Sequence, residues 1–135
     1  MAKGYDSYQA RQQALSLFGK DLARRSKSTC ELSGKSNIPL FIYEIPPVPK
    51  EPSYDNCLFL SENTIQQLES AKKHLVPDQW RHLNELIWHE LPTIQIISYK
   101  ILTFIAKEHP WAQDILAEAY LDDAIIAQAN THPLT

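Results

Sequence analysis

The chain has 135 residues, of which 44% are hydrophobic and 21% are charged. This composition is typical of a globular protein and argues against wholesale disorder. A length well below roughly 250 residues predicts a single domain over residues 1–135. We expect a cytoplasmic protein without a membrane partner, because no apolar run resembles a signal peptide or approaches the about 18 residues of a membrane span. Cys30 and Cys57 are expected to be reduced thiols.

Charge is distributed unevenly along the sequence. Residues 1–35 contain seven Lys/Arg and three Asp/Glu, whereas residues 36–135 contain six and thirteen. The simplest interpretation is a basic helix end that complements the helix dipole and the acidic remainder of the chain. The alternative is contact with nucleic acid, for which the basic side chains of this region are the candidates: Lys20, Arg24, Arg25, Lys27 and Lys35.

The first half of the chain predicts a helix followed by a β-hairpin. After a loose tail over residues 1–5, apolar residues recur at helical spacing and indicate an amphipathic helix over residues 6–27. A polar turn at residues 30–34 leads to a β-branched and aromatic run at residues 38–45, which predicts a strand. Four prolines between residues 46 and 52 indicate an extended loop. Residues 57–60 then predict a second strand, antiparallel to the first.

The second half predicts helices only. Residues 65–75 favour a short helix, and Pro77 and Asp78 are typical of a cap for a further helix that continues from residue 80 to residue 91. Isoleucines at positions 94, 97, 101 and 105 share one face of the next helix. Asp122 is suited to cap a last helix that ends near Ala129. The expected fold is therefore α+β, with an N-terminal helix, a hairpin over residues 28–65 and a helical layer over residues 66–130.

Several polar side chains are candidates for catalytic or metal-binding groups. His82, Glu85 and His89 fall on one polar face of the helix expected over residues 80–91. His82 and His89 would lie about 10.5 Å apart along the axis, so one ion cannot bind all three and a solvated face is preferred. His74 and His109 are isolated and predict surface positions. No catalytic residue is assigned.

Apolar and aromatic residues of the helical half also have two interpretations. The three tryptophans are expected to be buried or half-buried, because each has apolar neighbours three or four positions away. Ile96, Tyr99 and Thr103 lie opposite the isoleucine stripe of their helix. A second layer of intramolecular packing is the simpler account of these three residues, and a modest partner surface is the alternative.

Six segments together resemble the PhnA-like proteins, a family associated with a bacterial alkylphosphonate-utilisation operon. The segments are GKDLARRSKSTCELSG, IPLFIYEIPPVP, DNCLFLSENT, QWRHLNELIW, LPTIQIISYKIL and WAQDILAEAYLDD. The resemblance covers roughly residues 14–129. It implies that the hairpin is a zinc ribbon or zinc knuckle.

The same resemblance implies that this zinc site has degenerated. Transferred onto this sequence, the four ligand positions of the family are Cys30, Ser33, Ser61 and Thr64. Zinc in structural sites takes thiolate or imidazole ligands, and neutral hydroxyl groups are poor substitutes. We therefore expect no metal or other cofactor here, although the relatives bind zinc. Hydroxyl groups at Ser33 and Ser61 can still bind turn amides, and Gly34 suits a left-handed turn position.

The expected function is that of a PhnA-like interaction or structural module with an unidentified protein partner. A phosphonate-metabolism context is implied by the family resemblance alone. Nucleic-acid binding through the basic N-terminal helix and the knuckle is the first alternative. A phosphonate hydrolase is the second, although a chain with three glycines contains no Gly-rich phosphate loop.

Overall fold

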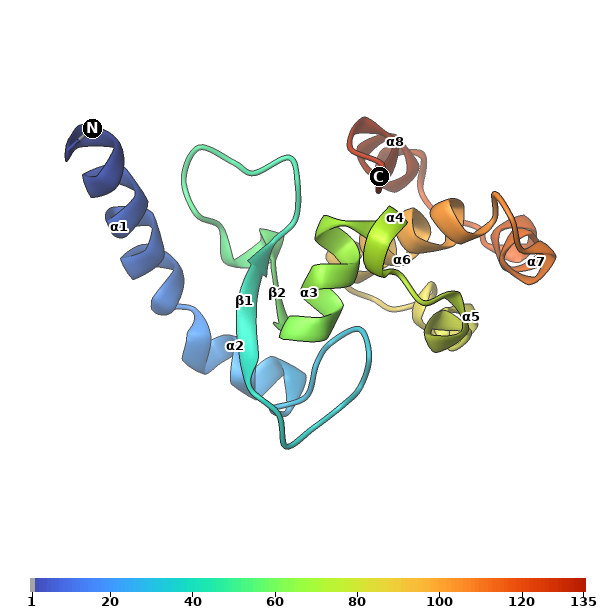
Figure 1. Cartoon of the computed structure of the whole chain (residues 1–135), viewed down its shortest axis with the longest axis horizontal. Coiled ribbons are helices and arrows are strands. Elements are labelled where there is room, and N and C mark those ends of the chain that lie inside the picture. Colours follow the sequence, from blue (N-terminus) through green and yellow to red (C-terminus); the bar gives the residue numbers. More distant parts are fainter. Residues whose placement is uncertain (1) are drawn as a thin grey trace. The chain divides into compact units, whose positions relative to one another are not determined.

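The computed structural model describes residues 2–135, and the side chains of residues 7–135. The fold is α+β and combines helices with one antiparallel two-stranded sheet (Figure 1). The chain divides into two compact units, Met1–Ser61 and Glu62–Thr135, and the division falls between the second strand and the helix that follows it. The single domain expected from the length stays a prediction.

The first unit begins with two helices in place of the single helix expected over residues 6–27. Helix α1 spans Ala2–Ser16 and helix α2 spans Gly19–Ser26, so residues 2–5 are helical and the expected loose tail is wrong for them (Figure 1). The break lies at Leu17 and Phe18, whose amides donate to carbonyls only three residues earlier. Gly19, a weak helix former, begins the new helix directly after this tight turn.

The hairpin forms as the sequence predicts. Strand β1 spans Leu40–Glu44, strand β2 spans Cys57–Ser61, and the two strands are antiparallel with Ile42 opposite Phe59. The proline-rich connection closes where Ile45 and Asn56 exchange hydrogen bonds, and it contains a short 3-10 helix, η1, over Tyr54–Asn56. Helix α2 packs against β2.

One face of the hairpin carries the core of the first unit. The side chains of Ile42, Cys57 and Phe59 share this face because residues opposite one another in the register point the same way. The buried members of this core are Leu15, Leu22 and Cys57, and Phe18, Ile42, Tyr54 and Phe59 pack against them. The helix break allows α1 and α2 each to contribute a leucine to this core.

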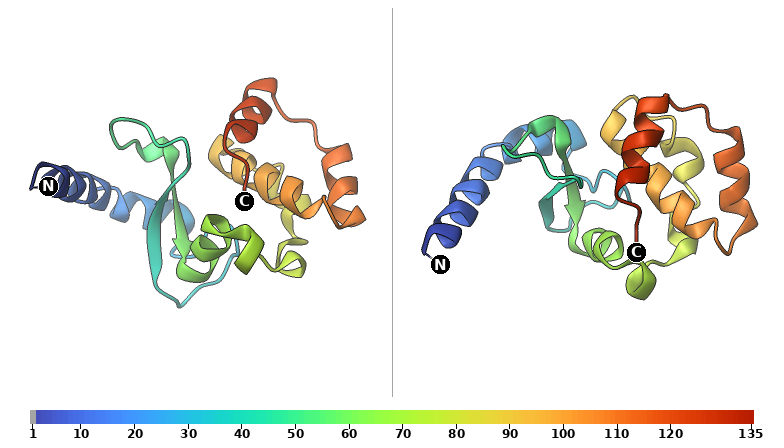
Figure 2. Two further views of the ribbon diagram at one scale, coloured as in Figure 1. Left: turned by 45° about the horizontal axis from the view of Figure 1, so that its top comes forward. Right: turned by 90° about the horizontal axis from the view of Figure 1, so that it is seen from above.

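The second unit is helical. Its elements are α3 (Glu62–Glu69), α4 (Ala71–His74), the 3-10 helix η2 (Pro77–Trp80), α5 (Leu83–Leu86), α6 (Pro92–Ile105), α7 (Pro110–Glu118) and α8 (Asp123–Thr131). Helix α6 packs against α5, α7 and α8, and Figure 2 shows it from two further directions. The four expected stripe residues of α6, Ile94, Ile97, Ile101 and Ile105, are all buried.

The helix expected over residues 80–91 is wrong. This segment contains η2, the four-residue helix α5 and turns, with many amides donating to carbonyls three residues back. It is rich in residues of modest helix propensity, such as Asn84, Trp88 and two histidines. Trp80 is buried and Trp111 is half-buried as expected, but Trp88 is 52% exposed, contrary to expectation.

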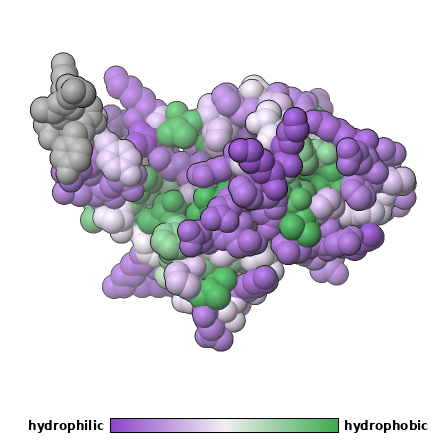
Figure 3. Space-filling model, in the orientation of Figure 1, coloured by the Kyte–Doolittle hydropathy of each residue, from purple (hydrophilic) through white to green (hydrophobic). Residues whose placement is uncertain are grey.

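The surface is largely polar. Hydrophilic residues cover much of the face seen in Figure 3, and hydrophobic residues are visible there in separate groups. In the part of the chain that the structure describes, no helix is both long and apolar enough to span a bilayer.

Candidate functional site

The most elaborate polar structure of the first unit is the turn at residues 30–34, here called the knuckle. Its ends are joined because the amide of Gly34 donates to the carbonyl of Cys30 and the amide of Cys30 donates to the carbonyl of Lys35. The amide of Ser33 donates to the sulfur of Cys30 over 3.4 Å. Gly34 has a φ of 76°, so its expected left-handed conformation is confirmed.

The Ser33 hydroxyl binds a backbone amide of the turn region, as the sequence predicts. Its oxygen accepts a hydrogen bond from the Lys35 amide at 3.4 Å. The knuckle is therefore closed by backbone, thiol and hydroxyl groups of the chain itself. Just outside the turn, Thr29 and Ser36 form an isolated antiparallel β-bridge. This bridge extends the backbone pairing of the two segments that enter and leave the knuckle.

Glu31 fastens the knuckle to strand β2. The amide of Glu31 donates to the carbonyl of Phe59 at 2.9 Å, and the amide of Phe59 donates to Oε1 of Glu31 at 2.8 Å. Arg25 of helix α2 donates from Nε and Nη2 to the two oxygens of the same carboxylate, at 2.9 and 2.7 Å. We call this group, Arg25, Glu31 and the backbone of Phe59, the clamp.

The clamp is an ion pair largely withdrawn from solvent. The side chain of Glu31 is 5% exposed and that of Arg25 is 18% exposed. Arg25 also donates to the carbonyl of Cys57 and lies 5.0 Å from the centre of the Tyr54 ring. Burial alone would lower the pKa of Arg25, but the hydrogen bond and negative charge of Glu31 outweigh it and raise that pKa. The guanidinium is thus a permanent cation that links α2, the knuckle and β2.

A second bidentate arginine ties helix α1 to the hairpin. Arg11 donates to both carboxylate oxygens of Glu44 at the end of β1, and to the carbonyls of Pro49 and Lys50 in the proline-rich loop. The hydrogen bond to Glu44 raises the pKa of Arg11. The Arg11–Glu44 pair therefore holds α1 to the hairpin, as the Arg25–Glu31 pair holds α2 to the knuckle.

The four expected ligand positions of the degenerate zinc site can be placed individually. Cys30 and Ser33 both belong to the knuckle and are joined by the amide-to-sulfur hydrogen bond. Ser61 is the last residue of β2 and Thr64 lies in the first turn of α3, and both are buried. Among the side chains of residues 7–135, no group of three or more His, Cys, Asp or Glu residues is arranged to hold a metal ion.

Neither thiol is exposed. Neither Cys30 nor Cys57 forms a disulfide, and both side chains are buried. The Cys57 thiol donates to the carbonyl of Ser53 over 3.2 Å. Burial raises the pKa of Cys57 from 9.0 to about 11, and the negative charge of Glu44 adds to this effect. Cys57 is therefore protonated at neutral pH, which makes it a poor nucleophile and a poor metal ligand.

The candidate nucleic-acid residues divide into two groups. Arg25 is the cation of the clamp and is paired with Glu31, and its assignment as a contact for an external ligand stays a prediction. Lys20, Arg24, Lys27 and Lys35 are exposed. Arg24 makes only a long 3.9 Å contact with Asp21, and both of these side chains are largely solvated.

The polar residues of the helical half do not converge. His82 precedes α5, Glu85 lies within it, and His89 follows it, where its Nδ1 accepts a hydrogen bond from the Leu91 amide. The shared helical face expected for these three residues does not exist because the segment is not one helix. His74 is exposed and His109, which precedes α7, is half-buried.

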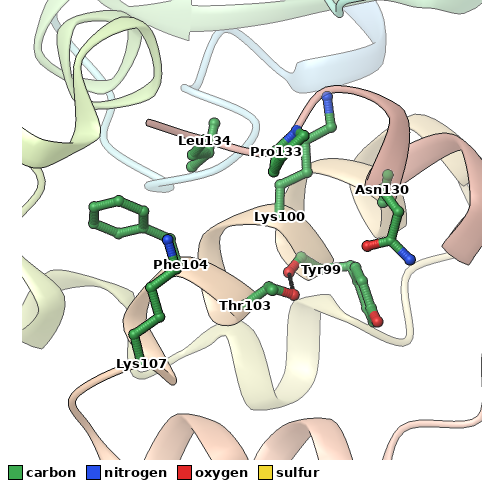
Figure 4. A pocket seen from close by; sticks show the side chains of 9 residues that line it. Tyr99, Lys100, Thr103, Phe104, Lys107, Asn130, Pro133 and Leu134 are labelled. Carbon is green, nitrogen blue, oxygen red and sulfur yellow. Dashed lines mark hydrogen bonds between the residues drawn. The ribbon is translucent and has the colours of Figure 1, made fainter.

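A small pocket of the second unit surrounds Lys100. It lies between α6, α8 and residues 133–134, and its volume is about 30 Å³ (Figure 4). Lys100 is 3% exposed, and burial lowers its pKa. Tyr99 and Thr103 line the same pocket, and Ile96 is buried, as intramolecular packing predicts. This volume holds no more than a water molecule or two, so the pocket is too small for an organic ligand.

Comparison of the chain with protein-family models, with curated proteins and with solved structures finds no match. The resemblance to PhnA-like proteins therefore stays a prediction.

Sequence reasoning missed the clamp. The sequence predicts Glu31 only as a residue of the polar turn, and Arg25 only as one of several basic residues near the end of a helix. The available signal is local, because an arginine lies six residues before a glutamate of the knuckle. The pairing with Phe59, twenty-eight residues away from Glu31, has no counterpart in local spacing.

Proposed function

We propose that this chain is a PhnA-like interaction module whose knuckle is maintained by an ion pair in place of a metal, and that it binds a partner without catalysing a reaction. The clamp is the observation that carries this proposal. Zinc knuckles use the metal to fix a turn against a neighbouring strand or turn. Here Arg25 and Glu31 supply a comparable cross-link between α2, the turn and β2.

The thiols support the same proposal. The Cys57 thiol donates a hydrogen bond to the carbonyl of Ser53 and is held in the protonated form, while the Cys30 sulfur accepts a hydrogen bond from the Ser33 amide. Both sulfurs therefore have structural contacts that need no metal. The conclusion is a preformed binding surface that does not depend on zinc supply or chelation.

The test is metal analysis of the purified chain together with thermal unfolding. We expect less than stoichiometric zinc, and a melting temperature that EDTA leaves unchanged. One equivalent of zinc per chain, with a lower melting temperature after chelation, would show that the knuckle needs a metal. Phosphate release from simple phosphonates by the same sample would contradict the non-catalytic part of the proposal.

Nucleic-acid binding is a second candidate, and one observation favours it. Four basic side chains near α2 and the knuckle, Lys20, Arg24, Lys27 and Lys35, remain exposed after Arg25 has been assigned to the clamp. They give this surface a positive charge that a phosphate backbone would complement.

A further inference from the structure

A shallow basin lies beside the knuckle, within the first unit. Its wall is formed by the end of α2 and by the segment that leads into β1, and its volume is about 510 Å³. This lies within the roughly 300–1,000 Å³ that is usual for small-molecule sites. The residues that line it are Lys27, Ser28, Ser36, Asn37, Ile38, Pro39, Leu40 and Phe59.

The polar half of the basin is unoccupied by other side chains of the protein. Within the part of the chain that the structure describes, the side chains of Lys27, Ser28, Ser36 and Asn37 make no hydrogen bond or ion pair. Together they offer an ammonium group, two hydroxyls and a carboxamide. The set contains no carboxylate, so it is suited to an anionic ligand.

The backbone of the basin is unusual in the same place. Lys27, Ser28 and Asn37 have φ values of 56°, 57° and 61°, and they are the non-glycine residues with positive φ among residues 2–135. All three line the basin. Left-handed conformations of non-glycine residues are costly and gather at functional sites. Lys27 adopts this conformation as the C-cap of α2, and asparagine tolerates it, so Ser28 is the residue of the rim for which it is most costly.

The other half of the basin is apolar. Ile38 is 37% exposed, Phe59 is half-buried, and Pro39 lies between Ile38 and the start of β1. An apolar floor beside cationic and hydroxyl groups suits a ligand that carries both a flat apolar ring and an anion. The bases of a single-stranded nucleic acid present such rings, whereas in a duplex the base faces are stacked and hidden.

We infer that this basin binds a segment of single-stranded nucleic acid, with a phosphate at Lys27 and a base against the apolar floor. This inference rests on the proposed metal-free module, because the clamp and the Thr29–Ser36 bridge hold the wall of the basin in place. Lys35 follows the knuckle and adds a second cation next to Ser36. Two exposed cations of α2 that are not part of the clamp, Lys20 and Arg24, extend the positive surface beyond the basin.

The binding test uses the full chain and a fluorescently labelled oligothymidylate of roughly 12 nucleotides, a length typical of single-strand sites. Anisotropy measured from low to high salt should show weaker binding as salt rises. Lys27→Gln should make the slope of log K against log salt less steep by about 0.7, the contribution of one phosphate contact on a single strand. Lys50→Gln, an exposed lysine of the same unit outside the basin, is the matched control and should leave the slope unchanged.

A second variant places a negative charge in the basin with little change in shape. Asn37→Asp keeps a residue type that tolerates the left-handed conformation, and it should weaken binding roughly tenfold by repelling the phosphate. Asn84→Asp, at an exposed position of the second unit, adds the same charge elsewhere and should have a small effect. Melting temperatures equal to that of the unchanged chain show that each variant is folded.

Several outcomes would overturn the inference. These are the absence of oligothymidylate binding by the folded chain, binding that Lys27→Gln and Asn37→Asp leave unaltered, and equal affinity for a duplex of the same length. Equally strong competition by a short phosphopeptide would assign the basin to a protein ligand. Each of these results leaves the metal-free knuckle intact, because zinc content and chelator sensitivity are measured on the same samples and test that proposal separately.

Discussion

Glu31 is the residue on which most of the first unit's polar structure depends. Its carboxylate accepts hydrogen bonds from Arg25 and from the Phe59 amide, and its own amide donates to Phe59. Removing one member of a buried ion pair is costly because it leaves the other charge without compensation. The stability of the first unit therefore depends on the negative charge of Glu31 as well as on its shape.

Replacing Glu31 by Gln should lower the free energy of unfolding by about 2–4 kcal/mol, since the neutral amide leaves the Arg25 charge uncompensated. Denaturant unfolding followed by circular dichroism measures this change. The matched control is Asp78→Asn, which removes the partner of Arg81 from an exposed pair. That variant should change stability by less than about 1 kcal/mol. Equal effects of the two substitutions would mean that the clamp adds no stability.

Cys57 predicts a loss of stability at alkaline pH. Burial raises the pKa of this thiol to about 11 in the folded chain, so the unfolded chain ionises first as pH rises above 9.0. Unfolding then releases a proton, and the free energy of unfolding falls between these two pH values by up to about 2–3 kcal/mol. Stability curves from pH 8 to 11 for the unchanged chain and for Cys57→Ala should differ in slope. Parallel curves would show that Cys57 titrates normally.

Among the elements, those defined by local pattern were predictable. Both strands and their antiparallel pairing follow from β-branched and aromatic runs on either side of a proline-rich loop. The isoleucine stripe of α6 identified its buried face because spacings of three and four place side chains on one side of a helix. Asp122 also precedes α8 as expected.

The helix breaks were not predictable from the same pattern. Trp80, Leu83 and Ile87 are all buried, as their spacing indicates, yet the segment alternates 3-10 and α-helical turns. Both geometries bring residues three or four apart to the same side, so periodicity identifies buried residues without fixing a continuous helix. The break between α1 and α2 has the same origin, because Leu15 and Leu22 keep helical spacing across it.

The candidate site was only partly predictable. The turn chemistry of Ser33 and Gly34 was expected from residue type, since both preferences are local. The clamp and the basin bring together residues more than twenty positions apart, since Glu31 binds Phe59, and Asn37 and Phe59 line the same basin. Charge composition predicts an anionic ligand for the basic region, but it does not reveal that Arg25 pairs with Glu31 inside the protein.

The junction between α3 and η2 is organised by a buried amide. The Gln67 oxygen accepts hydrogen bonds from the Trp80 indole and the Val76 amide, and its nitrogen donates to Asn63 and Gln79. Gln67 is 2% exposed and Trp80 is 1% exposed, so the Trp80 indole depends on Gln67 for its hydrogen-bond acceptor. This one side chain holds a helix and a 3-10 turn together in a segment with little regular structure.

Gln67→Leu should lower the free energy of unfolding by about 2–4 kcal/mol, because the Trp80 indole and the Val76 amide lose their acceptor in a buried setting. The neighbouring Gln66 is exposed, so Gln66→Leu is a matched control with an expected change within about 0.5 kcal/mol. Thermal or denaturant unfolding of the two variants gives the comparison. Similar losses from both would show that the Gln67 hydrogen bonds contribute little.

The resemblance to PhnA-like proteins makes its own prediction for the hairpin. If the family ligand positions are the ones assigned, restoring thiols by the combined changes Ser33→Cys, Ser61→Cys and Thr64→Cys should give a chain that binds one zinc ion with a cobalt-thiolate absorption band after substitution. The three single variants are the controls and should bind none. A triple variant that is folded but takes up no zinc would contradict the assignment of these positions.

At the scale of the whole molecule, the two compact units differ in charge. Residues 1–61 contain eight Lys/Arg and six Asp/Glu, whereas residues 62–135 contain five and ten. The first unit is therefore net positive and the second strongly negative. A polyanionic ligand experiences attraction to one unit and repulsion from the other, which favours binding at a defined part of the chain over non-specific coating.

Each stabilising network lies inside one unit, so we expect local effects in hydrogen exchange. Glu31→Gln should accelerate exchange in the amides of β2 and leave those of α6 unchanged, whereas Gln67→Leu should accelerate exchange in α3 and leave β2 unchanged. The double variant should lose the sum of the two single losses within about 0.5 kcal/mol. Equal acceleration in both units from either substitution would show that the two units open together.

The hydrogen bonds of Glu31 to Phe59 also affect how the sheet can grow. A sheet of two strands has outer edges where a strand from another molecule can add, and such additions begin polymerisation. At Phe59 both backbone groups on the outer side of β2 are already used, one by the amide and one by the carboxylate of Glu31. An incoming strand would have to displace an arginine-paired carboxylate to join there. The same side chain that orders the knuckle thus blocks the pairing of another strand with β2 at Phe59.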